Sequence, residues 1–228
     1  MTTDFARARS DEQRAVRRTA IVRTAAQLLG DGTRVAELSL NELARRVGLA
    51  KSNVLRYFET REAVLLALLD DVYGEWLDAL QTELEKTDAG AGVSPVELVA
   101  EAISRTVAER PVLSELVANT SMVLEHNVSA EIAADYKLRA YAQAMRLVDL
   151  VEIQVGALPE ASRIALAAAV NLAIGGAWGM CRPSPGMAAA YRSHPELAAM
   201  QLDYRVAVRE LVATVVTGLL ARPASEQL

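Results

Sequence analysis

Residues 39–65 read SLNELARRVGLAKSNVLRYFETREAVL and predict a helix-turn-helix. Ser39 and Glu42 have the spacing of a capping box, in which a serine hydroxyl caps the first turn of a short helix. Gly48 ends this helix, because a residue without a Cβ atom adopts a positive φ at little cost. A second short helix follows from about Ala50. Two short helices separated by a glycine turn are typical of proteins that place the second helix in the major groove of DNA.

The two short helices have an inner and an outer face, since apolar and polar residues recur at helical spacing. The inner face can form a small core of Leu40, Leu43, Val47, Leu49, Val54 and Phe58. The outer face carries hydrogen-bond donors suited to phosphates and base edges: Lys51, Ser52, Asn53, Arg56 and Tyr57. Double-stranded DNA is therefore the expected partner.

The rest of the chain also reads as helix, with no alternating strand pattern. Upstream of the quoted stretch, an apolar stripe is formed by Ile21, Ala25, Leu28 and Leu29. About nine helices are expected, at residues 10–30, 39–47, 50–57, 60–86, 95–109, 111–126, 129–156, 159–181 and 195–221. Irregular connectors are expected at residues 87–95 and 182–195. The predicted fold class is all-α.

Composition argues for a globular protein and against several kinds of catalytic site. Of the 228 residues, 52% are apolar and 23% are charged, which is ordinary for a folded chain. One cysteine rules out a disulfide framework, and two histidines leave little room for a zinc site. Nucleophile-elbow, phosphate-loop and dinucleotide motifs are absent from the sequence. We therefore expect no enzyme, no catalytic residue, no metal and no cofactor.

Charge is divided unevenly along the chain. Residues 1–61 contain 12 basic and 7 acidic residues, a net charge of +5. Residues 62–228 contain 12 basic and 22 acidic residues, a net charge of −10. A basic front on an acidic remainder indicates that one end of the molecule meets a polyanion. The arginines at positions 7, 9, 14, 17 and 18 form either an arm that follows DNA or a solvated end.

The quoted stretch resembles the N-terminal DNA-binding domain of TetR-family transcriptional regulators. The matching residues are Leu43-Ala44, Val47-Gly48-Leu49, Lys51, Tyr57-Phe58, Arg61 and Leu65. The resemblance implies a helix-turn-helix domain at residues 10–61 and a helical ligand-binding and dimerisation domain at residues 62–222. It also implies a cytoplasmic homodimer, most often a repressor, that binds a near-palindromic operator and is released by a small-molecule effector.

Seven residues are the predicted DNA contacts: Ser39, Lys51, Ser52, Asn53, Arg56, Tyr57 and Arg61. The motif places Lys51 and Arg61 at helix N-termini that face the DNA backbone. Asn53 and Arg56 can each read a base through two hydrogen bonds, although contact with phosphates alone is the alternative. The family usually has a phosphate-contacting aromatic residue where this chain has Leu55. That departure leaves open a helical small-molecule sensor or partner-binding protein that has lost sequence-specific DNA binding.

Two C-terminal segments, residues 160–181 and 200–221, are apolar on nearly every side and must be covered on every side. The resemblance implies that they pair with their twins in a four-helix dimer interface, where Gly175, Gly176 and Gly179 would permit close approach. An intramolecular core is the alternative. Residues 164–181 are also membrane-like, but they are Ala- and Gly-rich and short for a span, so no membrane partner is expected.

The resemblance further implies an effector pocket within the helical domain. Its candidate lining residues are Trp76, Met122, His126, Tyr136, Tyr141, Met145 and Trp178. Met and aromatic side chains fill irregular gaps whatever the function, so each is also a candidate core residue. The chemistry of this set suits an apolar or amphipathic small molecule.

Overall fold

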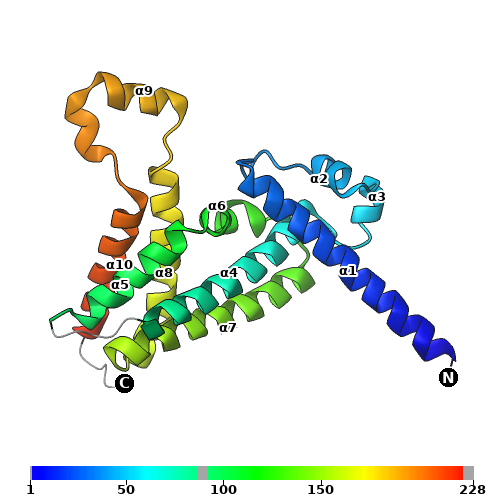
Figure 1. The fold of residues 1–228 in the computed structure, drawn as a ribbon, viewed down its shortest axis with the longest axis horizontal. Coiled ribbons are helices and arrows are strands. Elements are labelled where there is room, and N and C mark those ends of the chain that lie inside the picture. The colour runs from blue at the N-terminus through cyan, green and yellow to red at the C-terminus, as the bar shows by residue number, and fades with distance from the viewer. Residues whose placement is uncertain (1, 87–91, 223–228) are drawn as a thin grey trace. The chain divides into compact units, whose positions relative to one another are not determined.

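A computed structural model describes residues 2–86 and 92–222, and this part of the chain is helical without a strand (Figure 1). The predicted all-α class is confirmed. The described residues form ten α-helices: α1 (Thr2–Gly30), α2 (Leu40–Val47), α3 (Lys51–Val54), α4 (Arg61–Lys86), α5 (Pro95–Ala108), α6 (Pro111–Asn119), α7 (Ala130–Val155), α8 (Glu160–Met180), α9 (Pro185–Ser193) and α10 (Tyr204–Leu220). A π-helical segment η1 (Thr120–Leu124) follows α6, and a 3-10 segment η2 (Pro195–Met200) follows α9.

Internal contacts divide the chain into two compact units. The first unit comprises Met1–Val72 and Asn119–Lys137, and the second comprises Tyr73–Ala118 and Leu138–Leu228. The helices α4 and α7 therefore each contribute residues to both units. The predicted domain boundary between residues 61 and 62 stays a prediction.

The core of the first unit contains the apolar stripe predicted on α1. Ile21, Ala25, Leu28 and Leu29 are all buried, as expected from their helical spacing. Of the small core predicted for the helix-turn-helix, three residues are buried, namely Leu43, Val54 and Phe58. The other three, Leu40, Val47 and Leu49, are half-buried. Two further core residues, Val35 and Leu38, come from the loop between α1 and α2 and have no helical pattern that would reveal them.

The turn between α2 and α3 forms as the sequence predicts. The Ser39 hydroxyl accepts a hydrogen bond from the backbone N–H of Glu42 at 3.1 Å, which caps α2. Gly48 adopts φ 74° and ψ 31°, the left-handed conformation expected of a residue that ends a helix. The Leu49 N–H then donates to the Ala44 carbonyl at 3.0 Å. This hydrogen-bonded turn fixes the point at which α3 begins.

The second short helix is shorter than predicted. The α-helix α3 ends at Val54, and the chain continues to Phe58 in tighter turns. In those turns the Arg56 N–H donates to the Asn53 carbonyl at 3.2 Å, and the Tyr57 N–H donates to the Val54 carbonyl at 2.9 Å. These i−3 hydrogen bonds tighten the backbone, and the Phe58 N–H then donates to the Val54 carbonyl at 3.1 Å.

In the second unit, α10 packs against both α5 and α8. The buried residues on α8 include Leu166, Val170 and Ile174, and α10 contributes Val212 and Val216. By length and composition alone, α8 is long and apolar enough to cross a membrane, the one such helix in the described part of the chain. Its buried side chains pack within the second unit.

Gly175 on α8 lies against α6 of the same chain. A Cβ atom at this position would approach the Ala118 Cα atom to 3.1 Å, so the absence of a side chain is what permits the contact. By contrast, a Cβ atom at Gly176 or Gly179 would meet nothing within 4 Å. The sequence predicted that all three glycines let α8 approach a second protomer closely. Gly175 instead lets α8 pack against α6 of its own chain.

The segment between α8 and α10 corrects the prediction of an irregular connector. It forms α9 and η2, which extend beyond the ends of α8 and α10 (Figure 1). The Ser184 hydroxyl accepts a hydrogen bond from the Met187 N–H at 3.3 Å, and Pro185 occupies the first turn. The N-terminus of α9 is therefore capped. The last helix begins at Tyr204 rather than near residue 195, because the Asp203 carboxylate caps it by accepting from the Val206 N–H at 3.0 Å.

Candidate nucleic-acid interface

The exposed face of α3 carries the polar residues that the sequence pattern turned outward. Lys51, Ser52 and Asn53 are exposed in its first turn, whereas Val54 is completely buried. Arg56 is exposed in the turn that follows. The short helix and the turn after it therefore present an amine, a hydroxyl, a carboxamide and a guanidinium to solvent. These groups have the donors and acceptors that contact with base edges and phosphates requires.

The turn after α3 is attached to α1 through Arg18. Its Nη1 atom donates to the Tyr57 carbonyl at 2.6 Å, and its guanidinium lies 4.1 Å from the centre of the Phe58 ring. Both contacts involve the charged group, so they combine a charge-assisted hydrogen bond with a cation–π interaction. Sequence reasoning counted Arg18 among the residues of a possible arm. Its role in positioning Tyr57 was not predictable, because no local pattern connects residues 39 positions apart.

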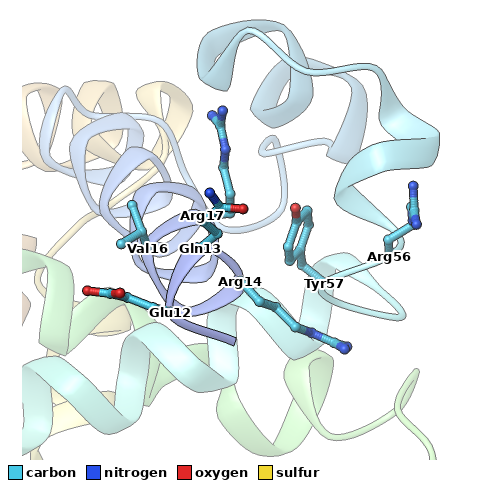
Figure 2. A pocket seen from close by; sticks show the side chains of 7 residues that line it. All are labelled: Glu12, Gln13, Arg14, Val16, Arg17, Arg56 and Tyr57. Atoms are coloured by element: carbon cyan, nitrogen blue, oxygen red, sulfur yellow. The ribbon is translucent and has the colours of Figure 1, made fainter. Parts of the chain in front are cut away.

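A groove of about 950 Å³ lies between α1 and this turn (Figure 2). Its lining is mostly polar and includes three arginines and one acidic residue: Glu12, Gln13, Arg14, Val16, Arg17, Arg56 and Tyr57. The residues from α1 thus share one surface with Arg56 and Tyr57 from the helix-turn-helix. The sequence suggested an arm but gave no indication of the groove.

The arginines of α2 are engaged by a carboxylate on the same helix. Arg45 donates to Glu42 from Nε at 2.9 Å and from Nη2 at 2.6 Å, and Arg46 donates more weakly at 3.4 Å. Hydrogen bonding from Arg45 lowers the pKa of Glu42. The Glu42 carboxylate is therefore occupied by these arginines, while its backbone N–H is capped by Ser39.

Arg61 begins α4, as predicted, and its guanidinium is directed toward its own chain. Its Nη1 atom donates to the Leu38 carbonyl at 2.8 Å and to the Val35 carbonyl at 3.4 Å. Its Nη2 atom pairs with the buried Glu62 at 2.8 Å. These contacts attach the start of α4 to the loop that precedes α2. Contact between Arg61 and a phosphate stays a prediction.

The candidate effector residues do not all belong to one unit. Met122, His126 and Tyr136 lie in the first unit, and Met122 is 76% exposed. Trp76, Tyr141, Met145 and Trp178 lie in the second unit.

Within the second unit these residues have different environments. Trp76 is completely buried and donates from Nε1 to the Thr106 hydroxyl at 3.0 Å, whereas Tyr141 is 58% exposed. Met145 and Trp178 are half-buried, and Trp178 donates from Nε1 to Glu115 at 2.8 Å. Among the described residues, no group of three or more His, Cys, Asp and Glu side chains could hold a metal ion.

Comparison with known proteins identifies the family. Residues 70–223 match the family described as "Tetracyclin repressor-like, C-terminal domain", which is about two thirds of the chain. The chain belongs to the TetR family of transcription regulators. The resemblance that residues 39–65 suggested at the N-terminal end is therefore confirmed from the other end of the molecule.

Sequence relatives match a short part of this TetR-family regulator. The HTH-type transcriptional regulator EthR of Mycobacterium tuberculosis, like that of Mycobacterium bovis, is 42% identical over 69 residues. That match spans 30% of this chain and about a third of the relatives' length, 32%.

Two solved structures share the fold. A TetR transcriptional regulator from Rhodococcus sp. RHA1 aligns with a TM-score of 0.54 at 18% identity, covering 91% of this chain and 99% of that one. A TetR-family regulator from Shewanella sp. PV-4 aligns with a TM-score of 0.50 at 20% identity, covering 87% and 96%.

Proposed function

We propose that this TetR-family regulator binds a near-palindromic operator as a homodimer and represses transcription until a small molecule releases it. The observation that carries the proposal is the exposed polar face of α3. Lys51, Ser52 and Asn53 are exposed there, while the next residue, Val54, is buried and holds the helix in place. Two such helices in a symmetric dimer would read half-sites about one turn of DNA apart, or a close multiple. A protein that acts in this way works in the cytoplasm beside the chromosome.

The proposal of a homodimer is supported by exposed apolar side chains on α8 and α10. On α8, Ile164, Leu172 and Met180 are exposed, and on α10 Val206 and Leu211 are exposed. The α8 residues stand eight positions apart, so each is turned by about 80° from the one before, and together they form an apolar stripe that winds around the exposed side of the helix. A large exposed apolar stripe marks an interface, and a symmetric dimer buries it against its own copy.

The proposal of an effector is supported by the half-buried Met145 and Trp178, which can reach a ligand without opening the core of the second unit. We expect an apolar or amphipathic molecule. Release of DNA requires that this molecule bind one state of the dimer more tightly than the other. Titration of a protein–operator complex with apolar, amphipathic and strongly charged small molecules tests this part, and release by charged hydrophilic molecules alone would contradict it.

Selection of bound sequences from a random duplex library tests the central proposal. We expect a motif with two symmetric halves and a binding constant that falls with salt. The same experiment decides the alternative of a sensor that has lost sequence-specific DNA binding. The observation that favours the alternative is Leu55, which is 42% exposed beside the donors of α3 and offers no hydrogen bond. Recovery of no sequence preference at any salt concentration would support it.

A further inference from the structure

We propose that Arg14 and Arg17 on α1 form a second contact with duplex DNA, in which they hold the phosphate backbone beside Arg56. This inference rests on the proposed function, because it extends the surface that α3 presents. The proposed site of this contact is the groove that α1 and the turn after α3 line together (Figure 2). Its occupant is a segment of sugar–phosphate backbone.

The first argument is the direction in which α1 presents these arginines. Gln13, Arg17, Ile21 and Ala25 follow one another at intervals of four residues, so they lie on one face of the helix. At Ile21 and Ala25 this face is completely buried in the core. At Gln13 and Arg17 the same face lines the groove. The buried face of α1 therefore continues into the groove, where Gln13 and Arg17 are exposed and can be reached by an anion.

The second argument is the balance of charge in the groove. Arg14, Arg17 and Arg56 contribute three positive charges, and Glu12 is the one acidic lining residue. Among the side chains that the structure describes, none pairs with these three arginines, whereas the neighbouring Arg18 is engaged by Tyr57 and Phe58. Guanidinium groups that line one groove without a carboxylate partner attract an anion with several charged oxygens, and arginine suits the geometry of phosphate.

The third argument is continuity with the reading surface. Arg56 and Tyr57 come directly after α3, whose exposed residues are the proposed DNA contacts. A backbone segment that passes Arg56 would therefore enter the groove and reach Arg14 and Arg17. Phosphate contacts of this kind position a protein on the duplex and carry no sequence information. The predicted effect is a gain in affinity for all duplexes alike.

The experiment measures binding of the full chain to a fluorescein-labelled 30-base-pair duplex of mixed sequence by anisotropy, between about 0.05 and 0.2 M KCl. Arg14→Gln with Arg17→Gln is expected to weaken binding by roughly tenfold or more at the lower salt concentration. It should also flatten the plot of log K against log salt by roughly one unit for each arginine in each protomer. Arg23→Gln is the matched control, because Arg23 is an exposed cation of α1 outside the groove. It should leave both quantities close to those of the wild type.

A second variant separates charge from helix stability. Arg14→Lys with Arg17→Lys keeps both charges and should restore most of the salt slope. The inference is overturned if the glutamine variant binds as Arg23→Gln does, or if the lysine variant loses as much slope as the glutamine variant. Failure of the proposed function looks different, because the wild-type protein itself would then bind no duplex at the lowest salt concentration.

Discussion

The two units of the molecule differ in the pairing of their exposed cations. In the second unit, six arginines are paired with carboxylates of the same unit: Arg105 with Glu83, Arg146 with Asp78, Arg163 with Asp149, Arg182 with Glu115, Arg205 with Glu101 and Arg209 with Glu97. In the first unit Arg45, Arg46 and Arg61 are also paired, but four cations have no such partner among the described side chains: Arg14, Arg17, Lys51 and Arg56. From this comparison we expect a polyanion to bind beside the unpaired cations of the first unit.

The two units also differ in the polarity of the surface that each exposes. The first unit exposes polar groups on α3 and along the groove, and the second exposes an apolar stripe on α8 and α10. We therefore expect substitutions in the two units to affect different properties. Changes in the first unit should alter DNA binding and its salt dependence, while changes in the second should alter assembly.

The largest effect is expected from a charge in the apolar stripe. Leu172 on α8 is 75% exposed, so Leu172→Glu should leave the protomer folded but bury an unpaired carboxylate in a dimer. Sedimentation at micromolar concentration should show a monomer, with operator affinity reduced by roughly a hundredfold or more, which corresponds to about 2.7 kcal/mol or more. Ile153→Glu on α7, also exposed but outside the stripe, is the control and should remain dimeric. A wild-type monomer at this concentration would contradict the proposed dimer.

The choice of residue matters for this test. Leu219 lies on α10 but is only 4% exposed, because it packs within its own protomer. A charge at Leu219 would unfold the second unit and would reveal nothing about assembly. Leu211, which is exposed on the same helix, offers an independent replacement for Leu172.

A smaller effect, on sequence preference, is expected from the exposed face of α3. Asn53→Ala and Arg56→Ala should each relax the preference at one symmetric pair of base positions. The expected loss is about 1–3 kcal/mol of discrimination at each site, with non-specific binding retained more fully. Selection from a random duplex library with each variant measures this directly. If both variants select the wild-type motif with unchanged information, these residues contact phosphates only.

Removal of the Arg18 side chain should loosen the turn after α3. Arg18→Ala deletes the hydrogen bond to the Tyr57 carbonyl and the contact with the Phe58 ring. We expect a loss of about 1 kcal/mol in the local stability of this turn. Hydrogen exchange of the amides of residues 54–58 is the measurement. The matched control is Arg17→Ala, one residue away, which should leave exchange at these amides unchanged.

The smallest effect is expected at Arg61, whose charge is shared with its own chain. Arg61→Ala should flatten the salt dependence by roughly one unit per half-site if the guanidinium also contacts phosphate, as the family motif predicts. It should also destabilise the first unit, because the carbonyls of Val35 and Leu38 lose their donor. Arg61→Lys separates the two effects, since it keeps the charge but cannot make both hydrogen bonds. If both variants keep the wild-type dependence of log K on log salt, Arg61 has only a structural role.

Local sequence patterns predicted the elements whose structure depends on neighbouring residues. The left-handed turn at Gly48, the cap at Ser39 and the buried stripe through Ile21 and Ala25 all follow from spacing alone. The outward direction of Lys51, Ser52 and Asn53 follows in the same way, because the apolar Val54 occupies the buried side of the short helix.

Contacts between distant residues could not be predicted in this way. The interaction of Arg18 with Tyr57, the groove beside it and the carbonyl partners of Arg61 depend on how helices and loops meet in three dimensions. The helix α9 was missed for a different reason. Its prolines and serines suggested a loop, although Ser184 and Pro185 are also a good start for a helix.

Gly175, Gly176 and Gly179 follow one another on α8, yet they should differ in how much sequence variation they tolerate. Every replacement of glycine adds a Cβ atom, and at Gly175 that atom would press on the backbone at Ala118. A library of variants sorted for soluble protein should therefore retain glycine at 175 and accept small residues at 176 and 179. Sorted for operator binding, the same library should also reject larger residues at the other two, because only a paired helix would limit them. The positions at which the two selections disagree would map the contact between protomers without a crystal.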